Sequence, residues 1–284
     1  METITASRVR SILPRRDPAS HKGDFGKLLC VCGSVGYTGA PVFASRAAVR
    51  TGAGLVFLAV PEQAWPVVAV KSEEAMPFPL PETAEGRLSL LAEEPIRQRA
   101  ASCDAVLIGC GLGRDRQTDA LVRKLLDIDR PLVLDADGLN ALDGCPEQLQ
   151  RRTAPTVLTP HEGEFLRLGG DLSRGREAAA AAFSRKYGVY LVLKGHRTLV
   201  ADPEGRLAVN ETGNSGMAKG GSGDVLTGLL TGLLAQGMEP FDACCAAVWI
   251  HGRAGDMAAE EKGRRGMTPA DMIEKLPYAL KEVE

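Results

Sequence analysis

A glycine-rich segment near the C-terminal end of the chain carries the strongest chemical signal. Four glycines fall within the eight residues 216–223, and Asp224 follows them directly before an apolar run. Glycine lets the backbone approach a ligand closely and turn its N–H groups inward. The start of the following helix adds unpaired N–H donors and the positive end of the helix dipole. These features predict an anion hole suited to a transferring phosphoryl group.

Asp224 is the candidate catalytic base. A carboxylate beside an anion hole can take the proton of a substrate hydroxyl while the phosphoryl group is transferred. The plainer interpretation is that Asp224 only caps the helix after the glycines. We favour the catalytic interpretation, and at Gly223 we expect a larger side chain to cause both backbone strain and blockage of the phosphate.

Other polar or glycine-rich segments each follow a short apolar run. They are Gly33–Ala40, Gly111–Gly113, Asp135–Asn140, Thr159–Glu164 and Lys194–Thr198. Segments that follow strands can face a ligand at the carboxyl edge of an α/β sheet. Plainer interpretations stay open: the glycines suit tight turns, His161 can be structural, and Lys194 and Arg197 can be solvated.

The carboxylates after one apolar run have two interpretations. Asp137 can cap the next helix. A carboxylate of Asp135 or Asp137 can instead hold Mg²⁺ through water, as phosphoryl transfer generally requires. Neither is preferred, so no metal ligand is assigned. His251 lies in an apolar helical segment and is interpreted as a core or interhelical histidine.

The elements that must position these residues alternate between two patterns. Short apolar runs bounded by Gly, Pro or Asp predict strands buried on both faces of a parallel sheet. They are Leu28–Cys32, Leu55–Val60, Ala105–Ile108, Leu132–Leu134, Val157–Leu158 and Tyr190–Leu193. Helical patterns lie between them, at Ala40–Thr51, Arg116–Leu126, Glu162–Leu168 and Arg174–Tyr187. This repetition predicts an α/β fold with a mostly parallel central sheet and helices on both faces.

The pattern changes after residue 196. Thr198–Ala201 and Leu207–Val209 flank the turn sequence Asp202–Gly205, which predicts a β-hairpin. Three helices are expected after it, at about Asp224–Gln236, Pro240–Glu260 and Thr268–Lys281. The proline-containing stretch Val67–Ala84 is expected to be a long connection. With no linker or repeat in view, residues 1–284 are expected to form a single domain.

Composition excludes several classes of protein. A net charge of −2 gives no general field to attract nucleic acid or an anionic membrane. Aromatic residues make up only 5%, too few for base-stacking platforms. The cysteines number 7 with no C-x-x-C pair, which predicts reduced thiols in a cytoplasmic protein. No apolar stretch is long enough for a membrane span, and no signal peptide is recognised.

Taken in order, these motifs resemble those of the ADP-dependent NAD(P)H-hydrate dehydratases of the ribokinase-like superfamily. The resemblance runs over about residues 20–280 and includes Gly33–Pro41, Asp135–Asn140, Thr159–Glu164 and the segment before Asp224. It implies a ribokinase-like fold and a lyase that repairs nicotinamide cofactors. ADP, or ATP in some members, phosphorylates the ring hydroxyl of the S epimer of hydrated NADH or NADPH with Mg²⁺. Phosphate then leaves, restoring NADH or NADPH and yielding AMP when ADP is used.

The resemblance also implies roles for individual residues. Contacts to the hydrated dinucleotide are implied for Ala40, Gly113, His161 and Asp224. Contacts to the phosphates and ribose of ADP are implied for Lys194, Gly195, His196, Arg197, Thr198, Gly220, Gly221, Ser222 and Gly223. Asp224 is the implied catalytic residue.

The sequence departs from the family pattern at three positions. Cys110, Glu162 and Ser215 stand where proline is common, and none of them supplies a reacting group. The family is often fused to an epimerase domain, for which we find no room in 284 residues. We therefore expect a separate NAD(P)H-hydrate epimerase as functional partner, and a homo-oligomer, by resemblance a tetramer.

Rival functions make different demands. A ribokinase-like kinase for a vitamin-precursor alcohol would use the same base and anion hole but release a stable phosphate ester. A non-catalytic nucleotide sensor would have lost Asp224 or the loop glycines, which are all present. A Rossmann dehydrogenase would need G-x-G-x-x-G, and Gly33, Gly36 and Gly39 have the wrong spacing.

Overall fold

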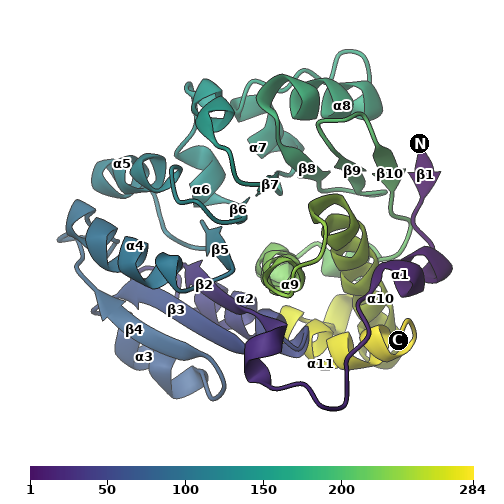
Figure 1. Ribbon diagram of the computed structural model, residues 1–284, viewed down its shortest axis with the longest axis horizontal. Helices are drawn as coiled ribbons and strands as arrows, with labels where there is room; N and C mark the ends of the chain where they lie inside the picture. The colour runs from purple at the N-terminus through teal and green to yellow at the C-terminus, as the bar shows by residue number, and fades with distance from the viewer.

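The computed structural model describes residues 1–284, and one ten-stranded sheet runs through the molecule (Figure 1). The strand order is β1-β10-β9-β8-β7-β6-β5-β2-β3-β4. The strands are β1 (Glu2–Thr3), β2 (Lys27–Val31), β3 (Leu55–Pro61), β4 (Met76–Leu80), β5 (Ala105–Ile108), β6 (Leu132–Leu134), β7 (Thr156–Leu158), β8 (Tyr190–Leu193), β9 (Leu199–Ala201) and β10 (Leu207–Val209). All pairings are parallel except those of β9, which is antiparallel to β8 and β10. The predicted mostly parallel sheet and C-terminal hairpin are therefore confirmed.

The helices form a layer on each face of this sheet. They are α1 (Ala6–Ile12), α2 (Gly39–Arg50), α3 (Trp65–Lys71), α4 (Glu93–Ala101), α5 (Arg116–Leu125), α6 (Asp137–Asn140), α7 (Glu162–Arg167), α8 (Arg176–Tyr187), α9 (Ser222–Ala235), α10 (Pro240–Gly266) and α11 (Pro269–Lys281). Figure 1 shows α9 at the centre of one layer, between the sheet, α2 and α10.

Alternate residues of the central strands enter two separate hydrophobic cores. Leu28 and Cys30 of β2 pack with α2, α9, α10 and α11, whereas Leu29 and Val31 pack with α4, α5 and α8. This alternation is the consequence of the period of two along a strand. Because both faces are covered, the strands read as continuous apolar runs, which is why the sequence pattern located them.

The stretch Val67–Ala84 is not a plain connection, contrary to the sequence prediction. It holds the end of α3 and the whole of β4, an edge strand that pairs only with β3. Pro77 and Pro79 lie at alternate positions of β4, so their missing N–H groups fall on the open side of the strand. Proline is tolerated at such an edge and discourages pairing with another chain.

The C-terminal elements follow the prediction closely. α9 and α11 begin and end within two residues of the predicted bounds, and α10 runs on to Gly266 instead of Glu260. Inside α10, Gly263 has a φ of 74°, which breaks the regular helix three residues beyond the predicted end. None of the helices combines the length and the apolar character that crossing a membrane would require. The cysteines are free thiols, as expected.

Candidate active site

The predicted site residues gather at the carboxyl ends of the parallel strands, beside the beginning of α9. α9 packs against β2, β5 and β6, so Asp224 in its first turn lies over the centre of the sheet. A methyl group on Gly111, after β5, would lie 2.8 Å from the β-carbon of Ala40 in α2. The segments after β2 and β5 are therefore in contact, as the sequence prediction requires.

The glycine-rich loop presents backbone donors that the chain does not use. The N–H groups of Gly221, Gly223 and Asp224 donate to no acceptor in the protein. They are among the N–H groups that a helix start leaves without an intrahelical partner. Gly221 has a φ of 100°, and a methyl group there would lie 2.8 Å from the Phe43 ring. The left-handed backbone thus belongs to Gly221, and the strain expected at Gly223 is not found, because Gly223 has no positive φ.

Side chains behind the loop hold it in place. Lys219 Nζ donates to the carbonyls of Arg265 and Met267 at the end of α10. Asn214 Nδ2 donates to Asp256 Oδ1 at 2.9 Å. The Ser222 hydroxyl lies 3.8 Å from Met272 Sδ in α11 and so faces away from the open side of the loop. The Ser222 backbone N–H is not free either, because it donates to the Lys219 carbonyl at 3.3 Å.

Asp224 has the electrostatic character of a general base. Burial and then the negative charge of Asp135 raise the pKa of Asp224 to about 7, while the Cys110 thiol and Lys194 oppose that rise. A base works best when its pKa lies near the operating pH. The Asp224 carboxylate makes no hydrogen bond to a backbone N–H of its helix, so the structure gives no support to a purely capping role.

Asp135 and Lys194 form the central ion pair of the site. Lys194 Nζ lies 2.7 Å from Asp135 Oδ1 and 3.8 Å from Glu164 Oε2. Burial acts to lower the pKa of Lys194, but the Asp135 and Glu164 carboxylates outweigh it and raise that pKa. The Thr159 hydroxyl donates to the same Asp135 oxygen at 2.8 Å. Lys194 therefore stays charged at the place where a phosphate would meet the free N–H groups.

Cys110 places a thiol between the two acidic side chains. Its Sγ, an oxygen of Asp135 and an oxygen of Asp224 all lie within 4.8 Å of one another. Sγ also lies 3.2 Å from Thr227 Oγ1 in α9. The hydrogen bond that the Cys110 thiol donates to Cys32, together with burial, raises the pKa of Cys110 well above its usual value, so the group is a neutral thiol.

This donor set does not form a protein cage for Mg²⁺. A neutral thiol is a poor ligand for a hard cation, and Asp135 Oδ1 is already committed to Lys194 and Thr159. Mg²⁺ usually keeps several waters and is held through substrate phosphates and one or two carboxylates. The residues therefore fit an ion carried on nucleotide phosphates, which the remaining carboxylate oxygens of Asp135 and Asp224 would hold through water.

Asp137 links two of the predicted segments instead of capping its own helix. Its Oδ2 accepts the Gly113 N–H at 2.8 Å, and its Oδ1 accepts from Asn140 Nδ2 at 3.3 Å. Arg167 Nε in turn donates to Asn140 Oδ1 at 3.1 Å. The Gly113 N–H is thus already satisfied, so a ligand beside Gly113 would meet its α-carbon or carbonyl.

His161 has a structural role that sequence reasoning left open. Its Nδ1 accepts the N–H groups of Gly163 and Glu164 at 3.0 and 3.3 Å, and Glu164 returns a bond to the His161 N–H. This capping box begins α7. With Nδ1 as acceptor, the ring proton lies on Nε2, and the side chain remains 56% exposed. His161 also pairs through its backbone with Lys194.

A test of His161 as a substrate contact must therefore preserve the cap. We expect His161→Asn to keep α7 and the thermal transition, because asparagine is a good N-cap, and to weaken use of the dinucleotide substrate more than that of ADP. His161→Ala should in addition lose about 0.5–2 kcal/mol of stability. Steady-state KM values for both substrates and thermal melts check this. Unchanged kinetics in His161→Asn would leave His161 a cap and nothing more.

The loop after β8 is held by an arginine that the sequence did not single out. Arg176, at the start of α8, donates to the carbonyls of Leu193, His196 and Arg197 at 3.0–3.2 Å. Arg197 has a φ of 59°, and its guanidinium pairs with Glu211 at 3.0 Å. Gly195 and Thr198 complete the turn through a hydrogen bond of 3.0 Å. No local sequence pattern indicates these hydrogen bonds and this ion pair, because they depend on how α8 packs beside β8.

His251 is confirmed as an interhelical histidine. Its Nε2 lies 2.9 Å from the Ser222 carbonyl, and burial lowers the pKa of His251 to about 4. The neutral ring therefore donates to α9 and supports the loop from α10.

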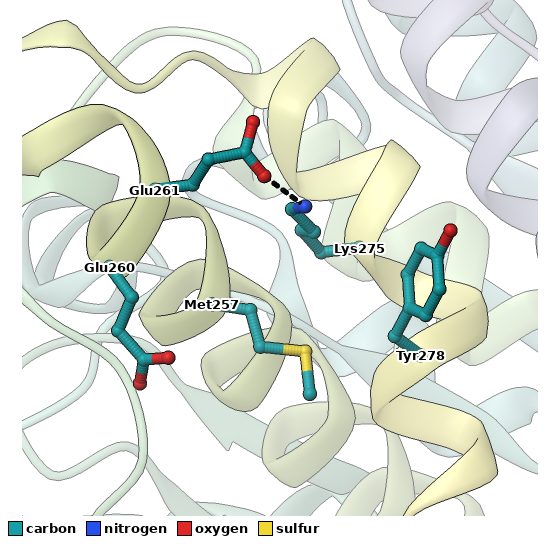
Figure 2. A pocket seen from close by; sticks show the side chains of 5 residues that line it. All are labelled: Met257, Glu260, Glu261, Lys275 and Tyr278. Carbon is teal, nitrogen blue, oxygen red and sulfur yellow. Dashed lines mark hydrogen bonds and ion pairs between the residues drawn. The ribbon is translucent and has the colours of Figure 1, made fainter.

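A separate exposed groove lies between α10 and α11, lined by Met257, Glu260, Glu261, Lys275 and Tyr278 (Figure 2). Lys275 is paired with Glu261 there, and none of the site residues described above lines the groove.

Comparison with known proteins identifies the family. Residues 28–278 match the family model described as NAD(P)H-hydrate dehydratase. The chain is 45% identical to the bifunctional NAD(P)H-hydrate repair enzyme Nnr of Moorella thermoacetica, over 99% of the chain and 54% of that protein. It is 39% identical to the ADP-dependent (S)-NAD(P)H-hydrate dehydratase of Neisseria meningitidis, over 91% of the chain and 86% of that protein. The chain spans about half the length of the bifunctional relatives that it matches.

A solved structure agrees with these relatives. The ADP/ATP-dependent NAD(P)H-hydrate dehydratase of Bacillus subtilis, co-crystallized with ATP and Mg²⁺, is similar with a TM-score of 0.84 and 31% identity. The similarity covers 100% of this chain and 99% of that one. It confirms the fold that the ordered motifs implied. The chain therefore belongs to the NAD(P)H-hydrate dehydratase family.

Proposed function

We propose that the protein dehydrates the S epimer of hydrated NADH and NADPH at the expense of ADP, or of ATP, with Mg²⁺. The observation that carries the proposal is the placing of Asp224, with a pKa of about 7, in the same helix turn as unused N–H donors and next to the Asp135–Lys194 pair. A base, a phosphate-binding backbone and a fixed cation are the parts that phosphoryl transfer to a hydroxyl requires.

The first step transfers a phosphoryl group to the substrate. The ring hydroxyl oxygen attacks the terminal phosphorus of ADP, an oxygen–phosphorus bond forms, and the bond to the bridging oxygen breaks to release AMP. Asp224 takes the hydroxyl proton. Lys194 and the N–H groups of Gly221 and Gly223 stabilise the charge on the moving phosphoryl oxygens. When bound with the nucleotide, Mg²⁺ would neutralise part of that charge.

The second step expels phosphate. The carbon–oxygen bond breaks and its electrons leave with inorganic phosphate. The lone pair of the ring nitrogen forms a double bond to the carbon that carried the phosphate. Loss of a proton from the adjacent ring carbon then restores the dihydronicotinamide. For this step the protein mainly binds the ring and keeps competing water away.

The two substrates are assigned to opposite sides of Asp224. Lys194, Gly195, His196, Arg197 and Thr198, together with Gly220, Gly221, Ser222 and Gly223, take ADP. Ala40, Gly113, His161 and Asp224 take the hydrated dinucleotide. Contact of the segments after β2 and β5 supports one side, and the nearness of Gly223 to Lys194 supports the other. His161 pairs through its backbone with Lys194, so it lies where the two sides meet.

Product analysis tests the proposal against a vitamin-precursor kinase. The protein is incubated with hydrated NADH, Mg²⁺ and either ADP or ATP, while nicotinamide absorbance and phosphate are followed. We expect reduced nicotinamide and inorganic phosphate in equal amounts, with no lasting phosphorylated dinucleotide. A thiazole or pyrimidine alcohol has no ring nitrogen placed to expel phosphate, so its ester would survive. Accumulation of such an ester, with no action on hydrated NADH, would overturn the proposal.

Partners, assembly and location belong to the same proposal. We expect an NAD(P)H-hydrate epimerase to supply the S epimer, and the protein to act in the cytoplasm on small molecules, not on nucleic acid or membranes. The expected homotetramer is checked by light scattering of the purified protein. A monomer in solution would contradict that expectation without affecting the reaction proposed.

A further inference from the structure

A tight turn after β4 brings an arginine to the edge of the site. The Thr83 N–H donates to the Arg87 carbonyl at 2.7 Å, and the Gly86 N–H donates to the Thr83 carbonyl at 2.9 Å. Glu82 and Leu88 pair on either side, so the turn is closed at its base. Arg87 therefore projects from a fixed backbone and not from a loose connection.

The same turn contacts two segments of the dinucleotide side. The Gly86 carbonyl accepts the Val35 N–H at 2.9 Å, which ties the turn to the segment after β2. The Arg87 side chain lies against Gly113, because a methyl group on that glycine would lie 2.4 Å from Arg87 Nε. Gly113 thus leaves room for the arginine, whose guanidinium comes within contact distance of a proposed substrate-binding residue.

The Arg87 guanidinium has few hydrogen-bond partners and no ion-pair partner in the protein. Its one hydrogen bond runs from Nη1 to the Glu85 carbonyl at 3.2 Å, and no carboxylate oxygen lies within 4.0 Å of it. Its Nε is buried and donates to no acceptor. A buried N–H without an acceptor is uncommon in native proteins and costs free energy. Nη2 also donates to no acceptor and keeps solvent access, so a ligand can meet it. Nearby Arg114, in contrast, is paired with Asp119.

We propose that Arg87 binds a phosphate of the hydrated dinucleotide, either its pyrophosphate or the 2′-phosphate of the NADPH form. This inference rests on the proposed function. The planar guanidinium matches phosphate oxygens in a fork of two hydrogen bonds. β4 and β8 lie on opposite sides of the central strands, so Arg87 is on the far side of Asp224 from Lys194 and the ADP end. With the nicotinamide ring at Asp224, the rest of the dinucleotide extends toward Arg87.

Binding of the reduced products provides the test. Dissociation constants of NADH and NADPH are measured by nicotinamide fluorescence for the wild type, Arg87→Gln and Arg87→Lys. We expect Arg87→Gln to weaken binding about 10- to 100-fold, as the loss of a charge-assisted fork would. Arg87→Lys should keep part of the affinity, because the charge stays and the fork is lost. KM for ADP should not change. Arg114→Gln removes the same charge one residue from Gly113 and is expected to bind both products like the wild type.

The pattern of losses identifies the phosphate. A loss confined to NADPH assigns Arg87 to the 2′-phosphate, and equal losses assign it to the pyrophosphate. Wild-type affinity for both products in a folded Arg87→Gln protein would overturn the inference, as would an equal weakening by Arg114→Gln. Failure of the wild type to turn over hydrated NADH would instead defeat the proposed function, so the two failures are distinguishable.

Discussion

Asp224→Asn is expected to remove most of the turnover while leaving the fold and ADP binding intact. The change is nearly isosteric and leaves the backbone N–H groups of the loop in place. It removes the group that takes the hydroxyl proton, which typically contributes about 10²- to 10⁴-fold to the rate. Single-turnover phosphate release measures the loss, and equilibrium binding of ADP serves as the control. Wild-type turnover in this variant would show that Asp224 is not the base.

The raised pKa makes this prediction sharper. Asp224 acts as a base only when ionised, so kcat/KM of the wild type should fall as the pH drops below about 7. The same shift affects stability with a definite sign. A carboxyl whose pKa is higher in the folded protein than the usual 3.8 destabilises the fold at high pH, and the penalty disappears as the pH falls toward that value.

Asp224→Asn should therefore stabilise the folded protein at the same neutral pH at which it removes turnover. The gain should grow between about pH 4 and pH 7, level off above that range, and reach up to a few kcal/mol. Thermal melts of both proteins at pH 5 and pH 8 measure it. A variant that is inactive but no more stable at pH 8 than the wild type would mean that the Asp224 pKa is not raised.

The central strands could be predicted because burial on both faces requires an uninterrupted run of apolar residues. After Lys27 at the start of β2, the residues of β2 and β5 are buried on both faces, so all of them are apolar and no surface pattern interrupts the runs. The hairpin of β9 and β10 was equally plain, since Pro203 and Gly205 mark its turn. The glycine-rich loop was recognised for a related reason, because a backbone that must meet phosphate excludes most side chains.

Elements at the periphery were missed because their signals are weak or opposed. β4 contains Pro77 and Pro79, which argue against a strand unless it is known to lie at an edge. α4 buries only Ile96 and Ala100, too few apolar positions to reveal a helical period. α1 and β1 are short, and β1 exists only because it pairs with β10. In each case tertiary contacts decide what local propensity does not.

Within the site, the sequence showed which residue types are present but not which residues contact one another. Lys194 and Asp135 are 59 residues apart, and only the order of β6, β7 and β8 brings them together. The sequence could not show that His161 caps α7, nor that Asp137 binds the Gly113 backbone. It also gave no sign of Arg87, because a single arginine in a turn is ordinarily a solvated charge. Pairing across the sheet is a property of topology, which single-sequence patterns do not contain.

Gly223→Val is expected to abolish nucleotide-dependent turnover with little effect on stability. A methyl group on Gly223 would lie 3.4 Å from Lys194 Nζ and 3.7 Å from Asp135 Oδ2, both ordinary contacts. The two further carbons of valine must then enter the space between the lysine and the free N–H groups, where the phosphoryl oxygens are proposed to bind. Gly223 is in the first turn of α9 without a positive φ, so valine causes no backbone strain there.

A graded series separates blockage from a general disturbance of the loop. Gly223→Ala should keep part of the activity, because its β-carbon fits. Gly266→Ala is the matched control, since a methyl group there also meets nothing within 4 Å and Gly266 has no proposed contact with either substrate. Loss of a single oxyanion donor typically costs about 10²- to 10³-fold, and Gly223→Val should cost at least that much because it displaces the phosphate from several donors. The assay is phosphate release at saturating ADP, with thermal melts on each variant. Undiminished turnover in Gly223→Val would mean that the phosphate does not bind at the beginning of α9, and an equal loss in Gly266→Ala would mean that blockage at that site is not the cause of the loss.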